Sequence, residues 1–562
     1  MMSPQTETRE AGVLIPLWTL SHQGDLGIGD ISSLRKLIPW IADAGLEFIQ
    51  LLPVNETDNT NSPYSAISSI ALDPIYLDLS LIPQIPRTAL GASQKENRVD
   101  YKSVRKRKSN LLRKAFRRFS FNSPEAKSFT VFQEKESNWL NTYSLFRYLM
   151  KKEGENPDWQ SWSPEYNTPE KAFQWFEEAI KEQADTVYQE ILYYEWLQWH
   201  CHKQWYSVRK YADLYRVKLM GDIPVGVSFN SADVFFEQEN FNLDWRGGAP
   251  PETFFKDDEF AIQWGQNWGI PLYNDEYLRS TGFSWWKRRV EKHTEIFSMF
   301  RIDHVLGLYR IYSFPWSPSK NKDFLGLSEK QAKKKTGGKL PRFTPNPDDT
   351  EEQQEENLER GDEILRVLQE AAGRAEIIAE DLGMTPEYVP PHLQSLEICG
   401  FKICHWESKE GTPKAVDTYP YYSFATFSTH DHPPLAALWN EARAGISDAD
   451  TRINSEKTLR ALAQIAQIAL PKSLTSEQEV PIFSTQILWG LLHYLFQTNS
   501  KYCALMITDI LEDPERFNVP STVGDHNWSY RISPSVEDFY KNRDLLQTQK
   551  TLASKVKSLG RR

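Results

Sequence analysis

The chain has 562 residues, of which 40% are hydrophobic and 25% charged, a composition typical of globular proteins with a large buried core. This length fits either one heavily decorated barrel or about three ordinary domains. The formal net charge of −11 argues against nucleic acid as a partner, because nucleic-acid binding needs a basic face.

The cysteines and the opening stretch indicate the compartment. None of Cys201, Cys399, Cys404 and Cys503 forms a C-x-x-C pair, which argues against a disulfide framework or a zinc site. The opening sequence, MMSPQTETREAG, is polar and lacks the apolar centre of a signal peptide. No apolar run approaches the roughly 20 residues that cross a bilayer. We therefore expect a cytoplasmic protein with no membrane partner.

The chain opens with a β-α-β pattern. GVLIPL at 12–17 and FIQLLPV at 48–54 predict strands, and apolar residues recur at helical spacing between them. Asp30 is placed to cap that helix, and Pro39 predicts a kink within it. The two strands are expected to be parallel, with a right-handed crossover. Tyr64 lies in the polar loop after the second strand.

From residue 85 to 205 the sequence is charged, rich in tryptophan and helical in pattern, which predicts a helical insertion. The basic run RKRK at 105–108 is expected on the solvent face of one helix, with LLRKAF at 111–116 supplying the buried side. LMGDIPV at 219–225 predicts the third strand. Asp222 within it is either functional or braces an arginine, because an isolated carboxylate is costly to bury.

Three later segments interrupt the remaining strands. Residues 230–290 are aromatic, and the Gly and Pro residues of RGGAPPETF at 246–254 and WGQNWGIPLY at 264–273 predict ordered loops. Residues 317–361 are charged and poor in apolar residues, which predicts either a mobile lid or an insertion without a role. Residues 433–497 are largely helical in pattern.

Eight strand signals result, near residues 13, 48, 219, 297, 375, 400, 423 and 502. Eight parallel strands with inserted segments predict an α/β fold, a (β/α)8 TIM barrel with large, mainly helical insertions. We divide the chain into the first part of the barrel at 1–84, the helical tryptophan-rich insertion at 85–205, and the rest of the barrel at 206–562, with insertions at about 230–290, 317–361 and 433–497.

Three of these strands are expected to end on a carboxylate, at Asp303 in FSMFRIDHVLG, Glu380 in AEIIAEDLG and Asp431 in SFATFSTHDH. The C-terminal ends of parallel barrel strands meet at one mouth, so the three side chains are expected in one pocket. Salt-bridged strand ends would explain any one of these carboxylates, but they explain the set of three poorly.

Such a set suits chemistry at a glycosidic bond. One carboxylic acid protonates the leaving oxygen, and in retaining enzymes a carboxylate attacks the anomeric carbon. Arg301 lies two residues before Asp303 and leaves the strand on the same face, which favours Asp303 as the nucleophile. Glu380 is then the acid, and its pKa must be raised by burial or nearby negative charge. Asp431, between His430 and His432, is suited to hold sugar hydroxyls.

Nine short stretches resemble those of one family. They are GDLGIGD, SPYSAISSIALDP, GDIPVGV, GAPPETF, GQNWGIPLY, FRIDHVLG, AEDLG, STHDH and FNVPST, and they span nearly the whole predicted barrel. In combination they are similar to the 4-alpha-glucanotransferases of glycoside hydrolase family 77, also called amylomaltase or disproportionating enzyme. The resemblance implies retaining double-displacement transfer of α-1,4-glucan segments, with release of glucose or short acceptor products.

The resemblance also implies residue roles and partners. Asp303 is expected to be the nucleophile, Glu380 the acid/base and Asp431 the transition-state stabiliser. Substrate contacts are expected from Tyr64, Asp222, Trp268, Arg301, His304 and His430. The family needs no cofactor or metal. The expected partners are maltooligosaccharides and glycogen or starch-derived glucans.

Some positions depart from the family pattern. His432 stands where Asn is usual, Glu252 stands where Asp is common, and VLGLYR replaces the frequent FRGF. None of these changes touches the three carboxylates, and they bear on acceptor preference.

Two other functions stay open at this point. One is an α-amylase-like hydrolase with the same barrel, in which water instead of sugar intercepts the glycosyl-enzyme. The other is a non-catalytic glucan-binding protein, against which the intact carboxylates argue. No motif indicates the donor length, the best acceptor, the transfer-to-hydrolysis ratio or the oligomeric state.

Overall fold

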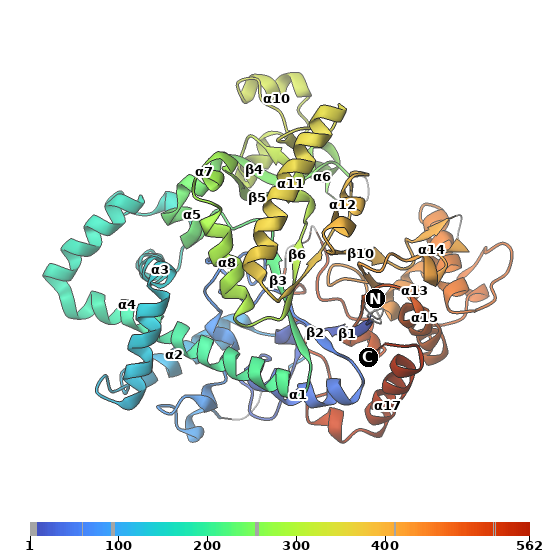
Figure 1. Cartoon of the computed structure of the whole chain (residues 1–562), viewed down its shortest axis with the longest axis horizontal. Coiled ribbons are helices and arrows are strands. Elements are labelled where there is room, and N and C mark those ends of the chain that lie inside the picture. Colours follow the sequence, from blue (N-terminus) through green and yellow to red (C-terminus); the bar gives the residue numbers. More distant parts are fainter. Residues whose placement is uncertain are drawn as a thin grey trace, which may run out of the picture.

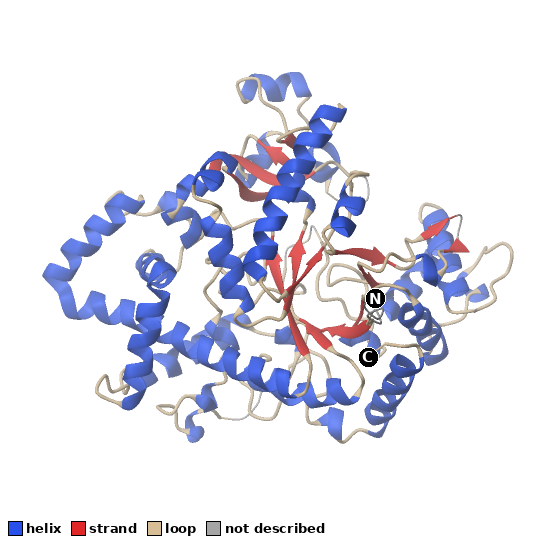
Figure 2. Cartoon of the chain, viewed as in Figure 1, coloured by secondary structure: helices blue, strands red, loops and turns tan. Residues whose placement is uncertain are grey.

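The computed structural model describes residues 8–58, 60–91, 96–252, 258–409, 412–520, 522 and 524–561. Eight parallel strands close into a barrel at the centre of the molecule (Figures 1 and 2). They are β1 (Glu10–Leu14), β2 (Phe48–Gln50), β3 (Lys218–Pro224), β6 (Met299–Asp303), β9 (Glu376–Ala379), β10 (Cys399–Ile403), β13 (Ser423–Thr426) and β14 (Tyr502–Met506). Each pairs with the barrel strands before and after it, and β14 closes on β1. The predicted TIM barrel and its eight strand positions are confirmed.

Side chains fill the inside of the barrel. The rings of Phe401 and Phe424 stack with centroids 4.6 Å apart. The Phe48 ring lies 5.8 Å from Phe424 and 5.8 Å from Tyr502. The barrel is therefore a packed core, and the strand ends are left to carry polar groups.

Helices surround this core, with α2 to α4 on one side of the barrel and α13 to α15 on the other in Figure 1. Among the described helices, none is long and apolar enough to cross a membrane. The helices are α1 (Ile31–Asp43), α2 (Tyr101–Phe116), α3 (Pro124–Lys152), α4 (Pro169–Leu214), α5 (Ala232–Phe236), α6 (Glu259–Trp264), α7 (Asp275–Ser280), α8 (Ser284–Thr294), α9 (Leu306–Tyr309), α10 (Glu329–Lys335), α11 (Glu351–Ala372), α12 (Val389–Ser395), α13 (Leu435–Ala444), α14 (Arg452–Ile465), α15 (Thr485–Gln497), α16 (Ile507–Ile510) and α17 (Arg543–Ser558).

Helix α1 begins where the sequence predicts. The Asp30 side chain accepts hydrogen bonds from the backbone N–H groups of Ser32 and Ser33, and the Ser33 hydroxyl oxygen accepts one from the Asp30 backbone N–H. This capping box satisfies donors that the first turn of a helix otherwise leaves without partners. The predicted cap is confirmed, and Pro39 lies inside the helix as expected.

A four-stranded antiparallel sheet replaces two of the predicted loops. Its strands are β4 (Phe241–Ala249), β5 (Gln266–Tyr273), β7 (Ile311–Phe314) and β8 (Arg342–Thr344), in the order β5-β4-β7-β8. The loop prediction was wrong for residues 246–249 and 266–273, because glycine here permits close pairing of the strands. A Cβ at Gly248 would lie 1.9 Å from the Gln266 carbonyl oxygen. The last two residues of the GAPPETF stretch, 253 and 254, lie outside the described residues.

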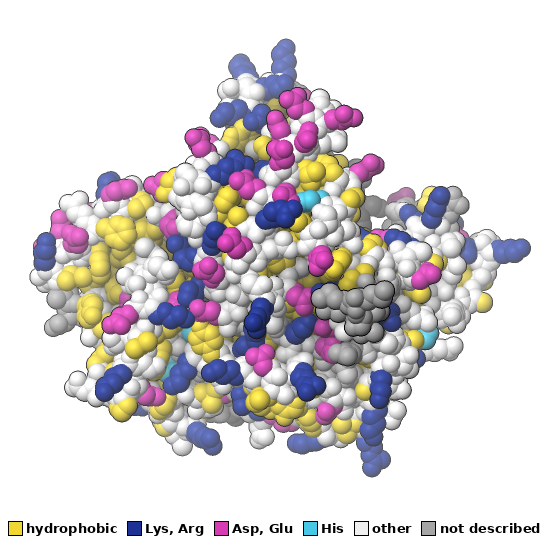
Figure 3. All heavy atoms as spheres, viewed as in Figure 1, with side chains coloured by type: hydrophobic (Ala, Val, Ile, Leu, Met, Phe, Trp, Pro, Cys, Tyr) yellow, Lys and Arg dark blue, Asp and Glu magenta, His cyan; other side chains and the backbone are white. Residues whose placement is uncertain are grey.

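The charged segment 317–361 also contains regular structure. It comprises a 3₁₀ helix at Pro318–Asp323, α10, β8 and the first part of α11, which begins at Glu351. Lysine side chains of α10 and acidic side chains of α11 lie at one end of the face in Figure 3. Over the rest of that face the two signs of charge are interspersed.

Two strands end earlier than their apolar runs suggest. β13 ends at Thr426 and β14 at Met506, where α16 begins. Asp509 causes the second change, because its carboxylate accepts the backbone N–H of Met506 at 2.9 Å and starts a helical turn. It also accepts the N–H of Leu435 at 2.8 Å, which ties the chain after β13 to the chain after β14.

The sequence predicts that the basic run at 105–108 lies on the solvent face of α2, and this prediction was wrong in part. Arg105 pairs with Asp73, and Lys108 is 2% exposed and donates to the carbonyl oxygens of Ile75 and Leu77 at 2.6 and 2.8 Å. The pattern failed because a long lysine side chain satisfies backbone carbonyls that a loop would otherwise bury without donors. These contacts join α2 to the chain that follows the Tyr64 loop.

Replacing Lys108 with methionine is expected to lower the free energy of unfolding by about 1–3 kcal/mol, because two buried carbonyl oxygens lose their donor. The matched control is Lys106→Met on the exposed side of the same helix, expected to change it by less than about 0.5 kcal/mol. Urea denaturation compares the two variants with the parent. Equal stability of the two would contradict the buried role of Lys108.

Candidate active site

A cavity of about 710 Å³ opens at the C-terminal ends of the barrel strands. Asp303, Glu380 and Asp431 all line it, so the structure brings the three predicted carboxylates together. Further lining residues come from the loops around the mouth and include Tyr64, Trp268, His304, Asn321, Asn518 and Trp528.

Asp303 and Glu380 lie on neighbouring strands. Asp303 is the last residue of β6, and Glu380 directly follows β9. The two strands pair in parallel with Ile302 opposite Ala379, so Asp303 and Glu380 occupy the next position along both strands. Adjacent strand backbones are about 4.8 Å apart, and equivalent positions point to the same side. The two carboxyl groups therefore face the same space.

Backbone donors hold Glu380 in place. Its Oε2 accepts the N–H of His304 and its Oε1 the N–H of Leu382, each at 2.8 Å. His304 presents its N–H from a left-handed conformation, with φ of 48°, which is uncommon for residues other than glycine. Burial and the nearby Asp303 carboxylate raise the pKa of Glu380 to about 8, although Arg301 opposes this shift. Glu380 is therefore mostly protonated at neutral pH, as a general acid must be.

A buried charge network lies behind Asp303. Arg301 donates to Asp303 Oδ1, and Arg301 Nε donates to Asp222 Oδ1 at 3.0 Å. Arg301 Nη2 also donates to the Tyr64 hydroxyl at 3.1 Å, and this hydroxyl donates to Asp222 Oδ2 at 2.8 Å. Asp222 and Arg301 are 1% and 2% exposed, and charges so deeply buried require such pairing. The structure thus gives Asp222 the bracing role that the sequence left open.

Asp431 lies in the loop beyond β13 and is fixed on several sides. Its Oδ1 accepts from Asn518 Nδ2 at 2.7 Å, and its Oδ2 lies 3.2 Å from His430 Nε2. Its backbone carbonyl accepts from Arg516 at 2.9 Å. Burial by itself would raise the pKa of Asp431, but His430, Asn518 and Arg301 hold it well below its usual range. Asp431 is therefore ionised at neutral pH and can accept hydrogen bonds from hydroxyl groups.

The six predicted substrate-contact residues divide into two groups. Tyr64, Trp268 and His304 line the cavity. Asp222, Arg301 and His430 are at most 2% exposed and support the groups in front of them. The Tyr64 hydroxyl lies 3.0 Å from His430 Nε2, and the two rings stack 5.3 Å apart. Direct contact of the second group with substrate stays a prediction.

Trp268 provides the exposed aromatic surface of the cavity. It is 40% exposed, and its ring meets the His304 ring edge-to-face with centroids 4.9 Å apart. Burial lowers the pKa of His304 to about 4, so its imidazole is neutral at pH 7. An exposed indole over a neutral partner suits the apolar face of an uncharged ligand.

His432, which departs from the family pattern, contacts its own loop. Its Nδ1 lies 2.8 Å from the Thr429 hydroxyl, and its ring meets the exposed Trp406 ring edge-to-face at 5.1 Å. Burial lowers the pKa of His432 to about 4, so it adds no charge beside Asp431 at neutral pH. The histidine at this position therefore leaves the charge near the carboxylates unchanged at neutral pH.

Two residues of the site were not singled out from the sequence. Asn518 bonds Asp431, and the Trp528 ring lies 5.9 Å from Tyr64 and 5.8 Å from His430. Both follow the last barrel strand, and loops after barrel strands form the active-site face. Asn518 lies inside the quoted FNVPST stretch, so position and motif together could have identified it.

The charged segment contributes Asn321 to the cavity wall. The neighbouring Trp316 and Phe324 rings stack with centroids 3.8 Å apart, which anchors this part of the segment. The closing movement of a lid stays a prediction. Among the described residues, no group of three or more His, Cys, Asp or Glu side chains is arranged to hold a metal ion.

Fold and site together define a class of enzyme. A TIM barrel whose strand ends present a protonated glutamate beside an arginine-paired aspartate, with a third, ionised carboxylate, has the groups that act on glycosidic bonds.

Comparison with known proteins identifies the family. The profile of glycoside hydrolase family 77, 4-alpha-glucanotransferase, matches residues 15–537, and the chain belongs to this family. A 4-alpha-glucanotransferase of Chlamydia pneumoniae is 30% identical over 542 residues, covering 94% of this chain and 92% of that protein. One of Thermus thermophilus is 27% identical over 531 residues, covering 92% and 93%. The chain is therefore an enzyme that transfers α-1,4-glucan segments.

A solved structure has the same fold. The amylomaltase from Streptococcus agalactiae, determined in complex with acarbose, superimposes with a TM-score of 0.76 at 23% identity. The alignment covers 98% of this chain and 99% of that one, so the fold is shared over the whole barrel and its insertions.

Replacing Asn518 with alanine is expected to lower kcat for maltotriose disproportionation by about 10- to 100-fold, because Asp431 loses a charge-assisted hydrogen bond that orients it. Asn518→Asp should be more harmful, since a second carboxylate would repel Asp431 and raise its pKa. Initial rates measure both variants, and circular dichroism confirms folding. If either variant kept the kcat of the parent enzyme, Asn518 would have no role in orienting Asp431.

Proposed function

We propose that the transfer proceeds through a covalent glycosyl-enzyme on Asp303. In the first step an Asp303 carboxylate oxygen attacks the anomeric carbon, while Glu380 gives its proton to the departing glycosidic oxygen. In the second step Glu380, now a carboxylate, takes the proton of an acceptor hydroxyl, and that oxygen displaces Asp303. Two inversions retain the α configuration. The observation that supports this most is the raised pKa of Glu380, about 8, beside an aspartate paired with Arg301.

Asp431 would act on the sugar next to the broken bond. Its carboxylate is partly exposed to the cavity and held ionised, so it can accept hydrogen bonds from ring hydroxyls. Such bonds strengthen when the sugar flattens toward an oxocarbenium-like transition state. Trp268 offers its indole face to a further sugar of the same chain.

We infer that the substrates are maltooligosaccharides and glycogen or starch-derived glucans. A cavity of about 710 Å³ with an exposed tryptophan and several amide side chains suits a neutral chain of sugars. Family membership supports transfer over hydrolysis, so a glucan hydroxyl and not water is the preferred acceptor. We also propose a reducing, cytoplasmic location, because all four cysteines are buried and free.

Incubation with maltotriose tests this function. The expected products are glucose and a ladder of longer maltooligosaccharides, which chromatography separates. Asp303→Asn should form none of them, because the nucleophile is lost. Glucose and maltose as the only products would mean that water is the acceptor and that the enzyme catalyses hydrolysis instead of transfer.

The pH dependence tests the role of Glu380. The acid must be protonated in the free enzyme, so kcat/KM is expected to fall above pH 8, approaching tenfold per pH unit. Glu380→Gln should lower kcat by about 100- to 10,000-fold, the usual contribution of general acid–base catalysis. Initial rates with maltotriose across the pH range measure both. An unchanged rate to pH 10 would exclude Glu380 as the acid.

A further inference from the structure

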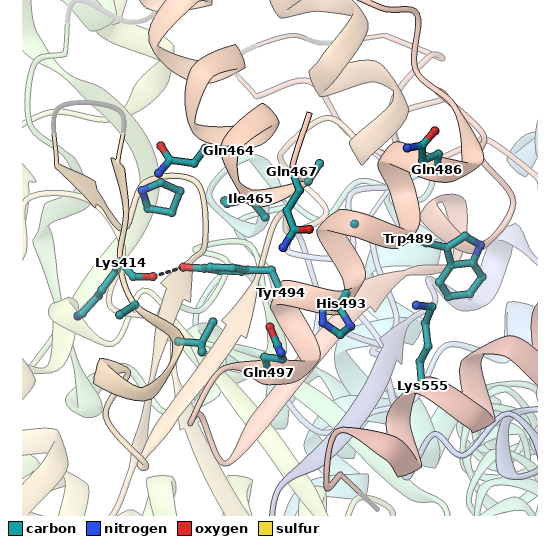
Figure 4. A pocket seen from close by; sticks show the side chains of 15 residues that line it. Lys414, Gln464, Ile465, Gln467, Gln486, Trp489, His493, Tyr494, Gln497 and Lys555 are labelled. Atoms are coloured by element: carbon teal, nitrogen blue, oxygen red, sulfur yellow. Dashed lines mark hydrogen bonds between the residues drawn. The ribbon is translucent and has the colours of Figure 1, made fainter. Parts of the chain in front are cut away.

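A second cavity, of about 490 Å³, lies outside the barrel. It is walled by the end of α14, by α15, by Lys555 of α17 and by residues 413–416, at the end of the small hairpin β11 (Ser408–Lys409) and β12 (Thr412–Pro413) (Figure 4). Among the described residues, none lines both this cavity and the catalytic one.

The second cavity faces away from the catalytic mouth. Residues 413–416 lead into the N-terminal end of β13, and Gln497 lies shortly before the N-terminal end of β14. The backbone N–H of Asn499 donates to the Val416 carbonyl at 2.9 Å, which joins these two approaches. The catalytic carboxylates lie at the opposite, C-terminal ends of the barrel strands. A ligand here would not occupy the reacting site.

Amide side chains dominate the wall. Gln464, Gln467, Gln486 and Gln497 are all exposed at its surface. Figure 4 shows Gln467 and Gln497 approaching the space beside His493 from opposite sides. Within the described part of the chain, no hydrogen bond engages any of these four side-chain amides. Each offers two donors and one acceptor oxygen, which matches hydroxyl groups that both donate and accept.

The base of the cavity is apolar and aromatic. Trp489 and Tyr494 are half-buried on α15, and Ile465 and Ala466 close the bottom. At Gly490 the two helices touch, because an added Cβ would lie 2.7 Å from the Ala466 carbonyl oxygen. The Tyr494 hydroxyl is fixed on the Lys414 carbonyl oxygen, as Figure 4 shows. Rigid aromatic side chains beside free amides are suited to the apolar and polar faces of a sugar.

The charge of the wall favours a neutral ligand. No carboxylate lines the cavity among the residues that the structure describes. Lys414 Nζ pairs with Glu407 at 3.2 Å, and Lys555 Nζ lies 5.6 Å from the centre of the Trp489 ring. One lysine engaged with an indole is a weak site for phosphate, which is bound by clustered Arg, Lys or backbone N–H groups.

We propose that this cavity binds a segment of α-glucan chain away from the reacting end. The proposal rests on the proposed function, because it takes glucan polymers as substrates. A polymer held here keeps its other parts near the enzyme, which raises the local concentration of chain ends at the catalytic mouth. Maltotriose is too short to gain from a second contact of this kind.

The test compares polymer and short substrates in one double variant, Gln467→Gly with Gln497→Ala. Glycine suits the left-handed backbone at position 467, where φ is 58°, and alanine suits the helix end at position 497, so the fold should be kept. The matched control is Gln547→Ala, an exposed glutamine on α17 that does not line the cavity. Initial rates with glycogen plus maltose and with maltotriose are measured, together with retardation in native gels that contain glycogen.

For the double variant we expect KM for glycogen to rise about tenfold, the effect of losing two ordinary hydrogen bonds, with weaker retardation in the gel. Its kinetics with maltotriose should match the parent, and Gln547→Ala should match the parent in every assay. Parental retardation and KM for glycogen in the double variant would overturn the second site. Equal losses on both substrates would overturn it as well. Failure of the parent itself to disproportionate maltotriose would instead refute the proposed function.

Discussion

The buried guanidinium of Arg301 is the interaction on which the site depends. It contacts Asp222, Tyr64 and Asp303, which come from β3, from the loop after β2 and from β6. Removing ions from water costs several kcal/mol each, and only multiple well-placed partners offset that cost. The arginine therefore fixes three neighbouring parts of the barrel relative to one another. The exposed end of this network is the Asp303 carboxylate, which is thereby held in one orientation at the cavity.

One barrel gives its three carboxyl groups different properties through their surroundings. Glu380 is buried beside a like charge, and its pKa rises to about 8 despite two backbone donors. Asp431 has His430 and an amide against its oxygens, and its pKa falls. When the surroundings shift the pKa values of two carboxyl groups in opposite directions, one can serve as the acid and the other as the ionised group. Without the like charge of Asp303, Glu380 would lose one cause of its protonation, so nucleophile and acid depend on each other.

Sequence patterns predicted the barrel well because buried parallel strands are short apolar runs with polar ends. The same rule located Asp303 and Glu380, which lie at or directly after a strand end. It failed where one side chain redirects the backbone, as at Asp509, and where glycine allows strands to approach closely, as at Gly248. The buried Lys108 was missed because its carbonyl partners become neighbours only in the folded chain.

The two cavities divide the demands that a long substrate makes. The catalytic mouth must enclose a few sugars tightly, since the charged groups there act strongly only where water is excluded. A polymer also carries many sugars that never react, and these can contact the enzyme only outside the barrel. A cavity near the N-terminal strand ends, walled by amides and aromatic rings, meets that second need without disturbing the Arg301 network. Binding of the polymer and reaction at its end then depend on different parts of the fold. Tighter binding of the polymer in the second cavity therefore need not slow release of products from the catalytic mouth.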